Sequence, residues 1–128
     1  MTNKPVVILP PLHIADQDDL MNRVREYADR LIVFMFTAEW CGPCKMIKTK
    51  IYSSNATCLS SLYKDEVVFM YIDVDACEKL SIMFDIESMP TFVINKVENG
   101  KLVKKDRFSG ASYESLMGKI NTYLAEKN

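Results

Sequence analysis

The chain has 128 residues, of which 48% are hydrophobic and 26% are charged. This length and composition are typical of one globular domain that buries a core without disulfide staples, and they exclude an intrinsically disordered chain. The 16 Lys and Arg residues against 17 Asp and Glu residues leave a net charge of −1, so no global field attracts nucleic acid or an anionic membrane. We therefore expect a single domain over residues 1–128, with neither nucleic acid nor membrane as a partner.

The N-terminal segment predicts an edge strand followed by a helix. An apolar run begins at Val6–Leu9 and extends toward Ile14, but the prolines Pro10-Pro11 confine it to a sheet edge or an irregular stretch. Asp16 is the expected N-cap of a helix from about Gln17 to Ala28. The segment resembles neither a secretory signal nor a membrane-spanning helix. We expect a cytoplasmic protein, with a nuclear or organellar location as the alternative.

The middle of the chain predicts two buried strands separated by helical segments. Leu31–Phe36 is apolar without alternation, which is typical of a central strand covered on both faces. The helix that begins near Cys44 meets the poor helix formers of Ser53–Thr57, and the apolar residues of Leu59–Tyr63 then resume a helical pattern. Val67–Val74 is the next apolar strand.

The C-terminal third predicts a short helix, a hairpin and a last helix. The short helix runs from about Cys77 to Phe84, and Phe92–Ile94 forms a strand. The turn residues Asn99-Gly100 join that strand to Lys101–Phe108. The last helix begins after Ser112 and carries four apolar residues on one face: Leu116, Ile120, Tyr123 and Leu124. The order of elements predicts an α/β fold with a mixed sheet and helices on both faces.

Two of the four cysteines lie close together, in the segment Trp40-Cys41-Gly42-Pro43-Cys44. Cys41 falls between the predicted strand Leu31–Phe36 and the helix that follows. Unpaired N–H groups and the helix dipole at such a junction favour a thiolate over a thiol. Because the thiolate is the reactive species, this context predicts a thiol–disulfide redox site formed by Cys41 and Cys44.

A metal site is the alternative use of these cysteines. Structural zinc usually takes two close pairs of ligands, whereas Cys58 and Cys77 are single and far apart, and His13 is distant from both. We therefore expect no metal. Free cysteines mostly behave as small buried hydrophobes, and the alternative for Cys58 and Cys77 is a regulatory thiol.

Four segments together resemble the thioredoxin family, and the likeness covers nearly the whole chain. They are Trp40-Cys41-Gly42-Pro43-Cys44-Lys45, Met89-Pro90-Thr91, Asn99-Gly100 and Phe108-Ser109-Gly110-Ala111. The resemblance implies a thioredoxin-like fold of three layers, α/β/α, with a central mixed sheet of about five strands and about four helices.

The resemblance also implies the activity, which is reduction of protein disulfides. In this reading Cys41 attacks the substrate, Cys44 resolves the mixed disulfide, and no cofactor is needed beyond the Cys41–Cys44 disulfide itself. Pro90 matches a cis-proline, and the implied substrate-binding residues are Trp40, Met89, Pro90 and Gly110. Gly42 and Pro43 complete the motif, and Pro43 is expected to favour the reduced form.

The implied partners are protein disulfide substrates, such as peroxiredoxins or ribonucleotide reductase, with a thioredoxin reductase as electron donor. The protein is expected to act as a monomer in electron transport and cell redox homeostasis. Some members of the family carry a cysteine where this chain has Cys77, so Cys77 is the better candidate for a regulatory thiol. The alternative function is a thioredoxin-like binding or scaffold subunit with slow or specialised redox activity.

Three departures from the family pattern favour that alternative. Met35 stands where a buried aspartate commonly helps to move the proton of the resolving thiol, so the base for Cys44 would be water, the Cys41 thiolate, or another carboxylate. The candidate carboxylates are Asp73, Asp75 and Glu39. Thr49 replaces a frequent proline in the active-site helix. The chain is also longer around Ser53–Cys58, where an extra turn is expected.

Overall fold

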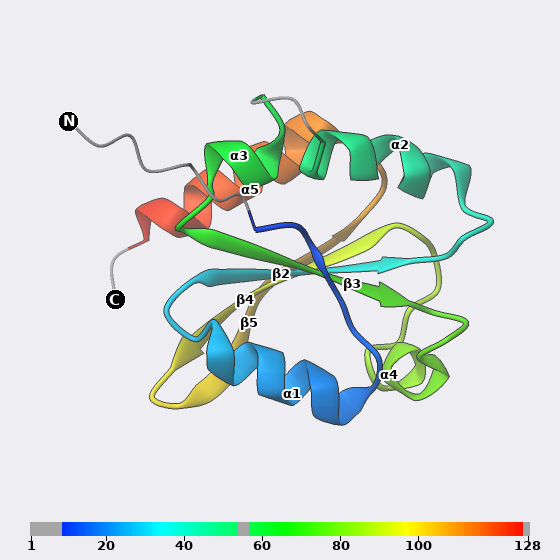
Figure 1. Ribbon diagram of the computed structural model, residues 1–128, viewed down its shortest axis with the longest axis horizontal. Coiled ribbons are helices and arrows are strands. Elements are labelled where there is room, and N and C mark those ends of the chain that lie inside the picture. The colour runs from blue at the N-terminus through cyan, green and yellow to red at the C-terminus, as the bar shows by residue number, and fades with distance from the viewer. Residues whose placement is uncertain (1–8, 54–56, 127–128) are drawn as a thin grey trace.

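The computed structural model describes residues 9–53 and 57–126 of the protein. Within them the chain forms five strands and five helices in the order β-α-β-α-α-β-α-β-β-α, and Figure 1 shows their arrangement. The strands are β1 (Leu12–His13), β2 (Leu31–Thr37), β3 (Val67–Asp73), β4 (Thr91–Glu98) and β5 (Lys101–Ser109). The helices are α1 (Gln17–Glu26), α2 (Gly42–Ile51), α3 (Leu59–Leu62), α4 (Glu78–Met83) and α5 (Tyr113–Ala125).

The strands form one mixed sheet in the order β1-β3-β2-β4-β5. β1, β3 and β2 are parallel, whereas β4 runs antiparallel to β2 and β5 antiparallel to β4. The central strands β2 and β3 are apolar almost throughout and nearly every residue in them is buried, as expected for strands covered on both faces. Asn99 and Gly100 both have positive φ, which closes the tight turn between β4 and β5.

Helices cover both faces of the sheet, which gives the three layers expected from the sequence. Figure 1 shows α2, α3 and α5 on one side and α1 and α4 on the other. Alternate residues of β2 point to opposite faces, so that Met35 lies in the core beneath α2 and Phe36 in the core against α1 and α4. Both side chains are fully buried.

The predicted elements agree with the structure in type, and several differ in extent. The helix α1 begins after its N-cap Asp16, whose carboxylate accepts the Asp19 amide at 2.8 Å, but it ends at Glu26 rather than near Ala28. The short helix α4 is flanked by Cys77 and Phe84 as caps instead of including them. The strand β4 runs beyond the predicted Phe92–Ile94 because it pairs with β5 along its whole length.

Two further details of the predicted fold differ from the structure. From residue 9 onward the first strand is Leu12–His13, at the sheet edge after Pro10-Pro11, because proline has no amide hydrogen for the ladder. The predicted start at Val6 lies outside the described residues. The described residues form five helices where about four were expected, since α3 is separate from α2. The predicted extra turn within Ser53–Cys58 falls partly on residues 54–56, which are also outside the description.

The candidate site, which contains Cys41 and Cys44, lies at one end of the sheet. The parallel strands β2 and β3 end there, and the N-terminus of α2 follows β2 after four residues. Among the described helices, none is long and apolar enough to cross a bilayer.

Candidate active site

Cys41 occupies the N-cap position of α2. The Cys44 amide donates a hydrogen bond to the Cys41 sulfur at 3.2 Å, and Pro43 lies in the first turn, where its missing amide hydrogen costs nothing. The first turn has no acidic residue. A negative charge on the Cys41 sulfur is therefore favoured by an amide donor and by the positive end of the helix dipole.

Cys41 and Cys44 are joined by a disulfide, with their Cα atoms 5.3 Å apart. This separation is within the usual range for a disulfide. The two residues differ in burial, since Cys41 retains 5% of its surface exposed and Cys44 retains none. Gly42 and Pro43 between them are exposed. A second molecule that approaches this loop therefore meets Cys41 before Cys44.

The segment before β4 lies against the disulfide. The Met89–Pro90 peptide bond is cis, as the resemblance implied, and the Met89 carbonyl oxygen lies 3.8 Å from the Cys41 sulfur. The Gly110 amide donates to the Pro90 carbonyl at 2.9 Å, and Gly110 has a φ of +106°, a conformation that favours glycine. The fold thus brings Met89, Pro90 and Gly110 to the same place as Cys41.

Trp40 borders the disulfide on its exposed side. Its side chain is 68% exposed, yet the indole nitrogen donates a hydrogen bond to the Asp75 carboxylate at 2.9 Å. Asp73 holds the Asp75 loop in turn, because its carboxylate accepts the backbone amides of Asp75 and Ala76 at 2.8 and 3.1 Å. The hydrogen bond between Trp40 and Asp75 holds an exposed aromatic ring beside the dithiol. This hydrogen bond was not predicted from the sequence. The only sequence signal is the acidic pair Asp73 and Asp75 at the end of β3.

Among the described residues, no buried carboxylate lies beneath the disulfide. Met35 is fully buried in the same cluster as Cys41 and Cys44. Of the three carboxylates considered as bases for Cys44, those of Asp73 and Asp75 accept the hydrogen bonds described above. Glu39 is exposed on the surface. No described group of three or more His, Cys, Asp or Glu side chains is arranged to hold a metal ion.

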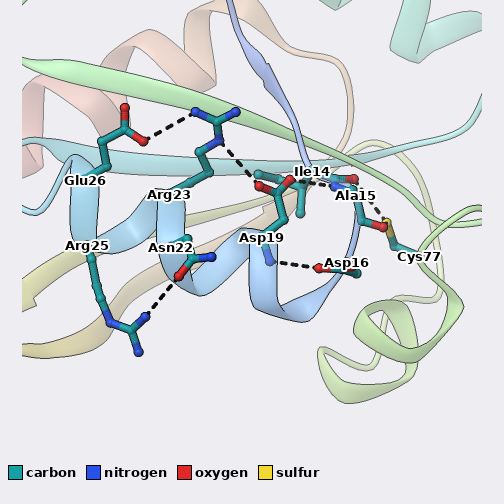
Figure 2. A network of polar contacts seen from close by, with 9 residues as sticks. All are labelled: Ile14, Ala15, Asp16, Asp19, Asn22, Arg23, Arg25, Glu26 and Cys77. Carbon is teal, nitrogen blue, oxygen red and sulfur yellow. Dashed lines mark hydrogen bonds and ion pairs between the residues drawn. The ribbon is translucent and has the colours of Figure 1, made fainter.

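Cys77 lies on the opposite face of the sheet from the disulfide, in the core against α1 and α4. It is buried, and its thiol donates to the carbonyls of Ile14 and Ala15 at 3.3 and 3.5 Å (Figure 2). Burial raises the pKa of this thiol above its ordinary value, and three nearby carboxylates raise it further: those of Asp73, Asp16 and Asp19. A buried thiol with a raised pKa is a weak nucleophile, so this geometry does not favour the regulatory role.

The two free cysteines are expected to resist modification in the folded, oxidised protein. Cys58 is also buried, and its thiol donates to the Ser53 carbonyl at 3.7 Å. We expect Ellman's reagent to find no reactive thiol in the native oxidised protein, and Cys58 and Cys77 after unfolding in guanidinium. Rapid reaction of one thiol per native molecule would contradict this reading and restore a regulatory role.

Comparison with known proteins agrees with this site. Residues 11–122 match the family model described as thioredoxin. Thioredoxin of Callithrix jacchus is 38% identical over 111 residues, which are 87% of this chain and 96% of that protein. The structure of Trichomonas vaginalis thioredoxin superposes with a TM-score of 0.77 at 27% identity, over 89% of this chain and 97% of that one. Fasciola hepatica thioredoxin gives 0.70 at 38% identity, over 87% and 97%. The chain belongs to the thioredoxin family.

Proposed function

We propose that this protein reduces disulfide bonds of other proteins through reversible exchange at Cys41 and Cys44. The observation that carries the proposal is the Cys41–Cys44 disulfide at the N-terminus of α2, with the attacking position partly exposed and the other fully buried. Membership of the thioredoxin family supports the same protein-disulfide oxidoreductase activity.

The reaction consists of two exchanges that balance in atoms and electrons. The Cys41 thiolate attacks one sulfur of the substrate disulfide, forms a mixed disulfide and releases the other substrate sulfur as a thiolate. Cys44 then attacks the Cys41 sulfur, forms the internal disulfide and releases the second substrate sulfur. The substrate gains two electrons and two protons, and the protein loses them. The only redox group required is the dithiol itself.

Substrate recognition is proposed to use the surface around Cys41. Trp40 offers an exposed aromatic face held by Asp75, while Met89 offers backbone groups beside the sulfur. An extended peptide that carries a disulfide can pair with such backbone groups as an added strand. Pro90 and Gly110, joined by a hydrogen bond, would support that segment.

The partners follow from the family and remain proposals for this chain. Peroxiredoxins or ribonucleotide reductase are candidate substrates, and a thioredoxin reductase is the candidate donor that restores the dithiol. We further propose that the chain acts as a single domain and a monomer in the cytoplasm.

An insulin-reduction assay tests this function against the scaffold alternative that Met35 favours. With dithiothreitol as the final reductant, catalytic amounts of the wild-type protein are expected to accelerate precipitation of the insulin B chain. Cys41→Ser is expected to match the rate of dithiothreitol alone. A wild-type rate equal to that of Cys41→Ser would support the scaffold and contradict the reductase.

A further inference from the structure

Two buried hydroxyl groups flank Met35 and have no hydrogen-bond partner within the described part of the chain. They are Thr37 Oγ1 and Tyr71 Oη, and both residues are more than nine-tenths buried. A buried hydroxyl without a partner is destabilising, because it has lost its hydrogen bonds to water and gained none in the protein. Native proteins rarely leave such groups unsatisfied, so each one needs an explanation.

Both hydroxyl-bearing residues lie on the sheet face beneath the disulfide. Tyr71 on β3 is the register partner of Met35 on β2, and their side chains belong to the cluster that also contains Cys44. Thr37 follows Met35 by two residues in an unbroken register, so its side chain points to the same face. Apart from the Tyr71 hydroxyl, the fully buried members of this cluster are aliphatic, aromatic or sulfur-containing.

The oxidation state of the dithiol changes what these hydroxyls can bind. In the disulfide form Cys44 has no S–H donor, and its neutral sulfur is a weak acceptor. In the reduced form Cys44 carries a thiol, whose S–H can donate a hydrogen bond and whose sulfur can accept one. Opening of the disulfide therefore adds a hydrogen-bonding group to a cluster that contains an unused hydroxyl.

The surroundings keep Tyr71 in its donor form. Burial raises the pKa of Tyr71 well above its ordinary value, so its hydroxyl retains the proton at physiological pH. Two cationic or titratable groups face its ring: the Lys48 ammonium of α2, 5.3 Å from the ring centroid, and the His13 ring of β1, at 5.4 Å between centroids.

We propose that Thr37 and Tyr71 form hydrogen bonds with the Cys44 thiol when the disulfide opens, and that these hydroxyls stabilise the reduced dithiol in place of a carboxylate. The proposal rests on the reductase function proposed above. Reduction of the Cys41–Cys44 bond takes two electrons and two protons from a dithiol reductant. The hydroxyl protons stay on their oxygens, so the hydroxyls act as hydrogen-bond partners of the thiol and not as acids.

Ser60 offers a matched control. Its hydroxyl is the third buried group without a partner among the described residues, and it lies on α3, beyond the C-terminal end of α2. The dithiol lies at the other end of α2, and a helix of ten residues spans about 15 Å. Removal of the Ser60 hydroxyl therefore changes the same kind of group without affecting the redox site.

The test compares Thr37→Val, Tyr71→Phe and Ser60→Ala with the wild type in glutathione redox buffers. We expect the equilibrium constant for reduction to fall by about three- to tenfold in each of the first two variants, as for the loss of one hydrogen bond. A tenfold fall corresponds to a potential about 30 mV more negative. Ser60→Ala is expected to stay within about twofold of wild type.

Thermal unfolding of the oxidised forms separates a redox role from general damage. Because the three hydroxyls are unpartnered in the disulfide form, none of the variants is expected to unfold at a lower temperature than wild type. The proposal would be overturned if Thr37→Val and Tyr71→Phe both had the same equilibrium constant for reduction as Ser60→Ala. Wild-type insulin reduction would be unaffected by that result, so the proposed function is tested independently.

Discussion

Cys44→Ser is expected to convert the protein from a catalyst into a trap for its substrates. Serine lacks a nucleophilic sulfur, so the mixed disulfide on Cys41 cannot be resolved within the molecule. Insulin-reduction turnover should fall by at least about a thousandfold, as for the removal of a group that acts as a unit with its partner. Cys41 keeps its position at the N-cap of α2 and can still attack.

The measurement for Cys44→Ser is non-reducing electrophoresis and mass spectrometry after incubation with a substrate disulfide. A covalent adduct should accumulate, should be released by dithiothreitol, and should map to Cys41. The matched control Cys41→Ser retains the buried Cys44, which has no exposed surface and should form no comparable adduct. Equal adduct on both variants would contradict the assignment of roles.

Met35→Asp is expected to destabilise the folded protein by about 3–5 kcal/mol at neutral pH. Met35 is fully buried in a cluster that contains no charged group, so the variant loses packing and must either bury a carboxylate or protonate it. The same carboxylate would stand beside the resolving thiol and could accept its proton. We therefore expect the pH profile of the resolving step to change as the stability falls.

The pH dependence of Met35→Asp has a defined sign. Burial raises the pKa of an aspartate in the folded state above its unfolded value of about 3.9. Below that value the carboxyl is neutral in both states, and only packing is lost. As pH rises toward the folded pKa, stability falls by about 1.4 kcal/mol for each unit. Urea unfolding of Met35→Asp and the uncharged control Met35→Asn at several pH values measures this, and parallel curves would contradict it.

The fold was largely predictable because its strongest signals are local. The uninterrupted apolar runs at β2 and β3, the Asp16 cap and the Asn99-Gly100 turn each determine their own segment. Element boundaries were less predictable. The length of β4 depends on its pairing with β5. The sequence between α2 and α3 contains poor helix formers, but it does not determine whether the helix is interrupted there.

The candidate site was predictable only in part, for the same reason. The motif around Cys41 and Cys44 and the Met89-Pro90 segment can be recognised in the sequence, and the fold brings them together. The hydrogen bond from Trp40 to Asp75 joins residues 35 positions apart, and no pattern signals it. The pairing of Met35 with Tyr71 depends on the register of β2 against β3, which appears only once the sheet is assembled.

Alkylation of the reduced protein across about pH 5 to 10 tests the central claim most directly, since thiolate alone reacts with iodoacetamide. Peptide mapping identifies which cysteine is modified at each pH. The expected result is modification of Cys41 alone at neutral pH, with a midpoint below the value of about 8.5 for a free thiol. Modification of Cys44 first, or a midpoint for Cys41 at or above that value, would contradict the account.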